Sequence, residues 1–314
     1  MSPTLHQALD ALRSADDLRP ASMHGLSDLD AAGIDETRRV WEQLPPLRRQ
    51  EAMQLFGEQA REHIELNFDQ LARLGLSDPD PLVRRRAVAN LWECEDASLQ
   101  GRFLELLQAD PDVGVRAEAA GALGRFVYRS EVGDVADEQK RALEDGLLAA
   151  AGAPERDLRL RSIESLGYSS RPEVTGLIQG AYETQEDSSK RTALLAMGRS
   201  SDRRWREAVI AEMRNASPEI RKEAAQAAGE LELRRSVPEL LELLEDTHPD
   251  VQQRAIWALG QIGGKSAERG LRRFLHAAPD TSLAAAAEES LEHLAFVDST
   301  RQLEEGLRAQ DQGD

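Results

Sequence analysis

The chain has 314 residues, of which 31% are charged, 40% hydrophobic and only 4% aromatic, and its formal net charge is −18 at pH 7. This acidic balance argues against a broad nucleic-acid surface, because neutralising phosphates requires many clustered Lys and Arg side chains. The single cysteine, Cys94, excludes an intrachain disulfide, and no apolar run approaches the roughly 18 residues of a membrane-spanning helix. Since the chain also opens without a secretory signal pattern, a cytoplasmic location is expected.

Residues 1–75 carry helical patterns interrupted by helix breakers. We expect this segment to be a helical cap that covers the apolar flank of the first full repeat, since the ends of repeat arrays need such cover. A degenerate repeat begins at Leu47-Arg48, where Glu51 stands in place of an inner alanine. The alternative is a separate functional domain.

From residue 76 to 297 one pattern returns seven times. Positions are counted as offsets from an anchor residue. Offset one is basic or polar, and offset four is small. Offset eight is apolar, and offset nine is usually Gly. The anchors are Val83, Val115, Leu158, Ser189, Ile220, Val251 and Leu283. The last four lie 31 or 32 residues apart, a period typical of stacked helical hairpins.

Each copy predicts an outer helix, a turn and an inner helix. Apolar residues at offsets 0, 4, 5, 7, 8 and 11 from the anchor share one arc of a 3.6-residue helix. Ser217-Pro218, His248-Pro249 and Asp80-Pro81 place a capping residue before a proline suited to the first helical position.

Glycine recurs at offset nine, inside the predicted inner helices. The five positions are Gly124, Gly167, Gly198, Gly229 and Gly260. A helical glycine costs about 1 kcal/mol relative to alanine, so its return at one phase predicts a neighbouring backbone too close for a Cβ. Trp92 occupies this offset in the first of the seven copies. We expect Trp92 to pack against the irregular N-terminal segment.

Two further segments depart from the period. The interval from Val115 to Leu158 is longer than the others, which indicates an insertion near 126–137. Added loops often carry recognition, so Tyr128 and Arg129 form a possible loop site. The alternative is an extended entry to the outer helix with no binding role. At the other end, residues 298–314 are expected to form a C-terminal capping helix and a frayed tail.

The Asp-Pro-x-x-Val-Arg pattern with following Ala, Leu and Gly, clearest at 217–229 and 248–260, resembles the HEAT-repeat family. The closest resemblance is to the bacterial PBS-lyase HEAT-like repeat type. It implies an all-α, right-handed α-solenoid of about seven to eight stacked HEAT-like helical hairpins. The resemblance also implies that the offset-one cations form a structural ladder with acidic turn residues. Those cations are Arg84, Arg116, Arg159, Lys190 and Arg221, and the acids are Asp80, Asp112, Asp157, Asp187 and Glu219.

Inner-helix offsets 2, 3, 6 and 10 point away from the apolar arc, so stacking would align them along a concave surface. Apolar and aromatic side chains flanked by cations on such a surface are typical of protein interfaces. The candidate partner-binding residues are Arg161, Tyr168, Arg191, Leu195, Lys222, Arg254 and Trp257. The alternative is structural: Trp257 folds over the adjacent repeat, and the arginines pair with Glu164, Glu223 and Glu230.

The favoured function is a non-enzymatic interaction scaffold whose concave groove holds a segment of a partner protein, an acidic segment being one candidate. No catalytic motif, phosphate loop or metal-ligand spacing is present, so no catalytic residue, metal or cofactor is assigned. A monomer is expected. One alternative, implied by the resemblance, is a lyase-like enzyme or subunit acting on a bilin or protein-bound ligand. A second is an alkyl-base DNA glycosylase with Glu164 as the acid, which the net charge disfavours.

Overall fold

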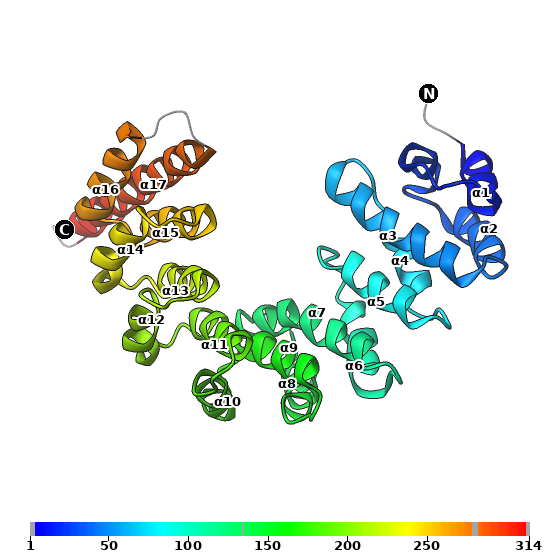
Figure 1. Cartoon of the computed structure of the whole chain (residues 1–314), viewed down its shortest axis with the longest axis horizontal. Helices are drawn as coiled ribbons and strands as arrows, with labels where there is room; N and C mark the ends of the chain where they lie inside the picture. The colour runs from blue at the N-terminus through cyan, green and yellow to red at the C-terminus, as the bar shows by residue number, and fades with distance from the viewer. Residues whose placement is uncertain (1–3, 134, 278–281, 312–314) are drawn as a thin grey trace. The chain divides into compact units, whose positions relative to one another are not determined.

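The computed structural model describes residues 4–133, 135–277 and 282–311, with side chains described as far as Phe296. Throughout these residues the chain folds into helices joined by turns and short connections (Figure 1), so the all-α prediction is confirmed. Among them, no helix is both long and apolar enough to cross a bilayer. The chain divides into two compact units, Met1–Ser165 and Leu166–Asp314.

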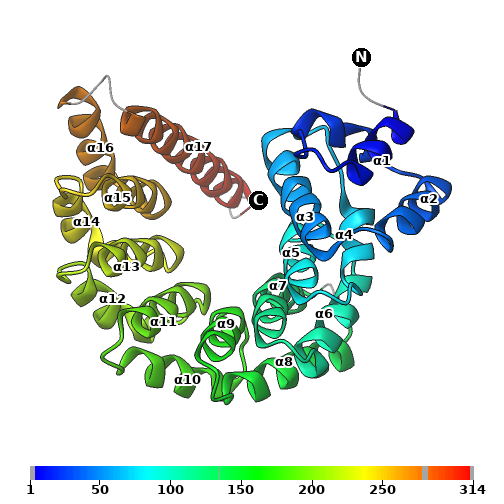
Figure 2. The same ribbon diagram turned by 45° about the vertical axis from the view of Figure 1, so that its right-hand side comes forward.

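The first unit holds the N-terminal helices and the first hairpins (Figure 2). Its elements are α1 (Leu5–Arg13), a 3-10 helix (Pro20–Leu26), α2 (Ala31–Trp41), α3 (Pro46–Glu62), α4 (Asp69–Gly75), α5 (Pro81–Asn90), α6 (Ser98–Ala109), α7 (Val113–Glu131), α8 (Asp137–Ala151) and α9 (Arg156–Leu166). The inner helices α3, α5, α7 and α9 carry the repeat anchors, while α4, α6 and α8 are the outer helices that precede them.

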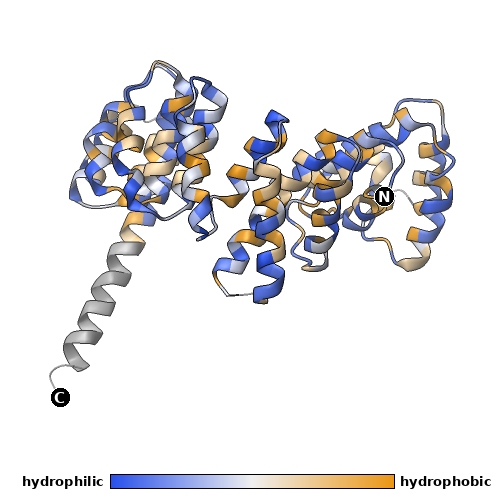
Figure 3. Ribbon diagram, turned by 90° about the horizontal axis from the view of Figure 1, so that it is seen from below, coloured by the Kyte–Doolittle hydropathy of each residue, from blue (hydrophilic) through white to orange (hydrophobic). Residues whose placement is uncertain are grey.

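The second unit continues the same alternation. Its elements are α10 (Pro172–Tyr182), α11 (Asp187–Arg199), a 3-10 helix (Arg203–Trp205), α12 (Arg206–Glu212), α13 (Pro218–Glu230), a 3-10 helix (Arg234–Ser236), α14 (Val237–Leu243), α15 (Pro249–Ile262), α16 (Lys265–Ala277) and α17 (Ser282–Asp311). The inner helices α11, α13, α15 and α17 pack in series, each against the next. Figure 3 shows apolar and polar residues interspersed along the described helices.

The glycines at offset nine confirm the predicted close approach. A Cβ built on Gly167 would lie 2.8 Å from the Ala196 Cα, and one on Gly198 would lie 3.0 Å from the Ala227 Cα. A Cβ built on Gly229 would likewise lie 3.0 Å from the Ala258 Cα. Each glycine thus faces the small residue at offset seven of the next inner helix. Inner helices can approach this closely only where neither residue carries a bulky side chain.

The repeat in α3 is regular, and the predicted register was wrong by one residue. Leu47 is 72% exposed and is not an anchor. Counting from Arg48 instead puts the fully buried Ala52 at offset four and Gly57 at offset nine. Gly57 faces Asn90, which stands at offset seven of the next repeat. The predicted replacement of the inner alanine by Glu51 therefore does not occur.

Arg48 itself explains why the anchor is not apolar. Its guanidinium donates hydrogen bonds to the carbonyls of Ala11, Leu12, Ser14 and Asp16, at 2.8 to 3.1 Å. These carbonyls lie at and just beyond the C-terminal end of α1, where a cation is favourable. At this anchor position, the Arg48 side chain therefore connects α1 to the first repeat by hydrogen bonds and does not pack in the core.

Three local predictions have different outcomes. Trp92 is 58% exposed and does not pack against the N-terminal segment, because α5 ends at Asn90 and the chain turns away. The insertion mostly lengthens α7, which runs on to Glu131 with Phe126 buried in the core. At the C-terminus, residues 298–309 continue α17, and their expected covering role lies outside the described side chains.

Candidate functional site: the inner face of α11, α13 and α15

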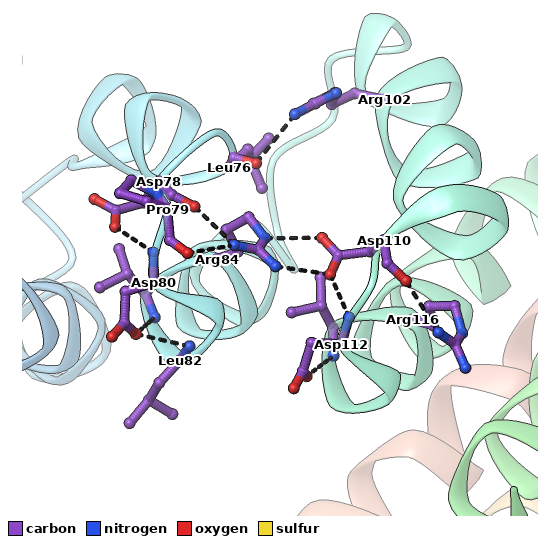
Figure 4. Close-up of polar contacts among 12 residues, drawn as sticks. Leu76, Asp78, Pro79, Asp80, Leu82, Arg84, Arg102, Asp110, Asp112 and Arg116 are labelled. Atoms are coloured by element: carbon purple, nitrogen blue, oxygen red, sulfur yellow. Dashed lines mark hydrogen bonds and ion pairs between the residues drawn. The ribbon is translucent and has the colours of Figure 1, made fainter.

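The offset-one cations form the predicted ladder, which assigns them to structure. Arg84 donates to both carboxylate oxygens of Asp110 at 2.8 Å and to the backbone oxygens of Asp78 and Pro79 (Figure 4). Arg221 repeats this arrangement with Asp246, at 2.7 and 2.9 Å. Arg84 and Arg221 therefore each join the turn before their own inner helix to the turn before the next.

The predicted acids of the ladder were wrong. The pairing carboxylates Asp110 and Asp246 stand five residues before the next anchor. Asp80 and Asp112 instead cap their own helices, accepting hydrogen bonds from the backbone N–H groups of Val83 and Val115. Three further pairs are Asp78 with Arg49, which is at offset one from Arg48, Glu155 with Arg116, and Glu212 with Lys190.

With the ladder accounted for, the polar side of α11, α13 and α15, together with Tyr168 just after α9, remains as a surface within the second unit. We call it the inner face. Its residues are Tyr168, Arg191, Leu195, Arg199, Lys222, Gln226, Glu230, Gln253, Arg254 and Trp257. Six of the seven predicted partner-binding residues belong to it.

Two of the predicted cations on the inner face are already paired. Arg191 lies 3.3 Å from a Glu223 carboxylate oxygen, and Lys222 Nζ lies 2.7 Å from Glu219. The Lys222 hydrogen bond is the main reason that the pKa of Glu219 falls below its usual value. Arg254, by contrast, forms no ion pair within the described part of the chain, and its guanidinium lies 5.9 Å from the Trp257 ring centre.

Glu230 is the unusual group on this face. One of its carboxylate oxygens accepts a hydrogen bond from the Gln226 amide. The other, Oε2, is buried against Gly198 and has no hydrogen-bond partner among the described residues; the same holds for Oε1 of Gln226. Burial raises the pKa of Glu230, although the nearby charges of Arg199 and Arg254 act in the opposite direction. A side chain with this environment is typical of functional sites.

The aromatic residues flank this carboxylate. The Trp257 indole is half-buried and rests against Gly229 of α13, which agrees with the structural alternative for this residue. The Arg199 guanidinium lies 5.0 Å from the ring centre of Tyr168, a cation–π distance. Leu195 is half-buried on α11. The face thus combines apolar area, cations and unsatisfied acceptors.

The other predicted residues lie in the first unit. Arg161 is exposed on α9, and its guanidinium lies next to Gly121 of α7. Tyr128 and Arg129 belong to the last turns of α7 and not to a loop. Arg129 donates a hydrogen bond to the backbone oxygen of Glu95, while Tyr128 is 52% exposed.

A family model described as HEAT repeats matches residues 70–145 and 206–292, more than half of the chain. A search of curated proteins finds no match. Among solved structures, YibA of E. coli is 14% identical, with 89% of this chain and 98% of that chain covered and a TM-score of 0.49. The CpcE–CpcF phycocyanin lyase complex of Nostoc sp. PCC7120 is 16% identical (72% and 94% covered, TM-score 0.49). Yeast importin-β, Kap95p, is 12% identical (92% and 46% covered, TM-score 0.49).

Proposed function

Because this chain belongs to the HEAT-repeat family, we propose that it is a non-enzymatic scaffold that binds a segment of a partner protein on the inner face. The stack of α11, α13 and α15 supplies a rigid support, since each inner helix is held against the next at backbone distance. The side chains that point away from this support are then free to determine which partner binds.

The observation that carries the proposal is the pair of unsatisfied acceptors, Glu230 Oε2 and Gln226 Oε1. A buried polar atom without a partner costs about 1–3 kcal/mol, so a face evolved only for solubility has no reason to keep two. Both oxygens are buried in the unbound protein, so the Gln226 side chain has to turn before backbone N–H groups of a bound segment can satisfy them. An extended segment fits this role, because a helix uses its own N–H groups internally.

Charge and apolar area support the same proposal. Arg254 has no ion pair within the described residues and would attract an acidic side chain of the segment. Trp257 and Leu195 offer half-exposed apolar surface on either side of α13, where side chains of the segment would pack. Arg191 and Lys222 contribute less, because Glu223 and Glu219 already neutralise them.

The test is partner capture with a photo-crosslinking residue placed at Gln253, an exposed position on the inner face. Lysate of the source organism is irradiated with the wild-type background and with the Arg254→Glu, Trp257→Ala double variant. We expect one or more adducts that the double variant loses. The matched control is Arg235→Glu, an exposed arginine on the connection before α14, which should leave the adducts unchanged.

Adducts that survive the double variant, or that the Arg235→Glu control also loses, would contradict binding at the inner face. Circular dichroism of each variant establishes that the helices are intact, so that loss of an adduct is not loss of fold.

A further inference from the structure

A cavity of about 560 Å³ lies in the first unit, lined by residues of α2, α3, α4 and the turn before α5. Its apolar lining comes from Ile34 and Trp41 of α2, Leu74 of α4 and Pro79 in the turn before α5. This volume lies within the range of roughly 300–1,000 Å³ that small-molecule sites occupy. The cavity is separate from the inner face, and of its apolar residues only Pro79 takes part in the ladder, through its backbone oxygen.

A buried carboxylate, that of Asp78, lines the cavity and already has its hydrogen-bond and ion-pair partners within the protein. Asp78 is 5% exposed, and its Oδ2 accepts a hydrogen bond from the Trp41 indole at 2.8 Å. The same oxygen lies 2.9 Å from Nε of Arg49, which is 7% exposed. Asp78 Oδ1 in turn accepts the backbone N–H of Asp80. The Asp78 charge is therefore compensated within the protein, and Trp41, which is 4% exposed, presents only a small part of its ring to the cavity.

The rim of the cavity carries more positive than negative charge. Across the whole chain, acidic side chains outnumber Lys and Arg by 57 to 39. Around this cavity the order is reversed, with Arg38, Arg49 and Arg73 against Glu42 and Asp78. Since Arg49 compensates Asp78, the remaining charges are two arginines against Glu42.

These arginines differ in how firmly they are held. Arg73 lies 2.7 Å from Asp96 and stands between this cavity and the neighbouring one that Cys94 lines. Arg38 has only an exposed partner on its own helix, Asp35 at 3.5 Å. Exposed pairs of this kind contribute less than about 1 kcal/mol, so Arg38 can turn to a ligand at little cost.

From this juxtaposition we infer that the cavity binds a small apolar carboxylate, with the apolar body against Trp41, Ile34 and Leu74 and the carboxylate paired with Arg38. The planar fork of an arginine matches a carboxylate with two parallel hydrogen bonds. A cationic ligand is disfavoured by Arg38, since Arg73 is already paired with Asp96. A neutral ligand would gain the apolar contacts but leave Arg38 without its new partner.

The test uses three probes of one shape: 1-naphthoate, 1-naphthylmethanol and 1-naphthylmethylamine, titrated into the full chain by calorimetry. We expect 1-naphthoate to bind about threefold more tightly than the alcohol, since an ion pair with the exposed Arg38 contributes less than about 1 kcal/mol. The amine should bind most weakly. Arg38→Ala should remove the advantage of the carboxylate, whereas Glu42→Gln should increase it severalfold.

Arg39→Ala is the matched control, because Arg39 is the exposed neighbour of Arg38 on α2 and does not line the cavity. Both arginines are exposed, so neither change should impair folding. Equal binding of the three probes, an effect of Arg39→Ala as large as that of Arg38→Ala, or no detectable binding of 1-naphthoate would each overturn the inference.

Discussion

Arg84 and Asp110 form a two-pronged ion pair that joins the turn before α5 to the turn before α7. Only 11% of the Arg84 side chain and 3% of the Asp110 side chain are exposed. Burial alone would raise the pKa of Asp110, but the hydrogen bonds from Arg84 and from the Asp112 backbone outweigh it, and the pKa falls below its usual value. Successive repeats of the first unit are thus connected by a compensated, buried charge.

Replacing Arg84 with alanine would leave Asp110 buried without its counter-charge. We expect the free energy of unfolding to fall by about 3 kcal/mol, measured by urea denaturation with circular dichroism. The adjacent Arg85 is the control: its side chain is 52% exposed and lies 3.4 Å from Glu118. Arg85→Ala should change stability by less than about 0.5 kcal/mol. Equal losses in the two variants would show that the ladder is not a structural ion pair.

The equivalent pair in the second unit, Arg221 with Asp246, predicts that the stability of the fold depends on pH. The Arg221 hydrogen bond holds the pKa of Asp246 below its usual value, so the folded state prefers the ionised form. The resulting stabilisation is present above the usual carboxyl pKa and is lost as pH falls through the lowered one. Between pH 6 and pH 3, the wild-type chain should therefore approach the stability of Asp246→Asn. A stability difference that stays constant over this range would refute the assignment.

The ionised form of Glu230 should lower the stability of the fold, whereas that of Asp246 raises it. Because burial raises its pKa, the ionised form costs stability above the usual carboxyl pKa, and the cost disappears as pH falls below the raised value. Glu230→Gln should therefore be more stable than wild type at pH 8, by about 1 kcal/mol, and equal to it near pH 4. Thermal unfolding at the two pH values measures this. Glu207→Gln, at an exposed position on α12, should show neither effect; a destabilised Glu230→Gln would mean that the carboxylate is a net structural contact.

The glycine contacts can be tested with a pair of substitutions. A Cβ on Gly229 would lie 3.0 Å from the backbone of Ala258, whereas one on Gly176 of α10 would meet nothing within 4 Å. We expect Gly229→Ala to lower the free energy of unfolding by about 2 kcal/mol, since backbone cannot easily give way. Gly176→Ala should raise it by about 0.5–1 kcal/mol through helix propensity. Stabilisation by both substitutions would contradict the predicted close approach.

Periodicity predicted the hairpins and the glycine contacts because both depend on backbone geometry that every copy shares. The misplaced register at Leu47 had a visible signal, since Ala52 and Gly57 stand at offsets four and nine from Arg48. The acids of the ladder could also have been found. Asp78, Asp110 and Asp246 each stand five residues before an anchor, a recurrence that went unnoticed beside the more prominent helix caps.

The inner face and the cavity are different. The Glu230 carboxylate is buried because Gly198 lets the neighbouring helix lie close to it and because the Gln226 side chain turns towards it. The cavity likewise depends on how Ile34 and Trp41 of α2, which lies outside the repeats, pack beside α4. Side-chain packing of this kind leaves no pattern in a single sequence.

The contact between glycine at offset nine and a small residue at offset seven separates two kinds of position on each inner helix. Substitutions at these offsets move the backbone, so the spacing of the repeats is fixed there. Substitutions at Gln226, Arg254 or Trp257 change the side chains that the inner face presents, without altering the spacing of the repeats. The side chains of the inner face can therefore change while the backbone framework of α11, α13 and α15 stays the same.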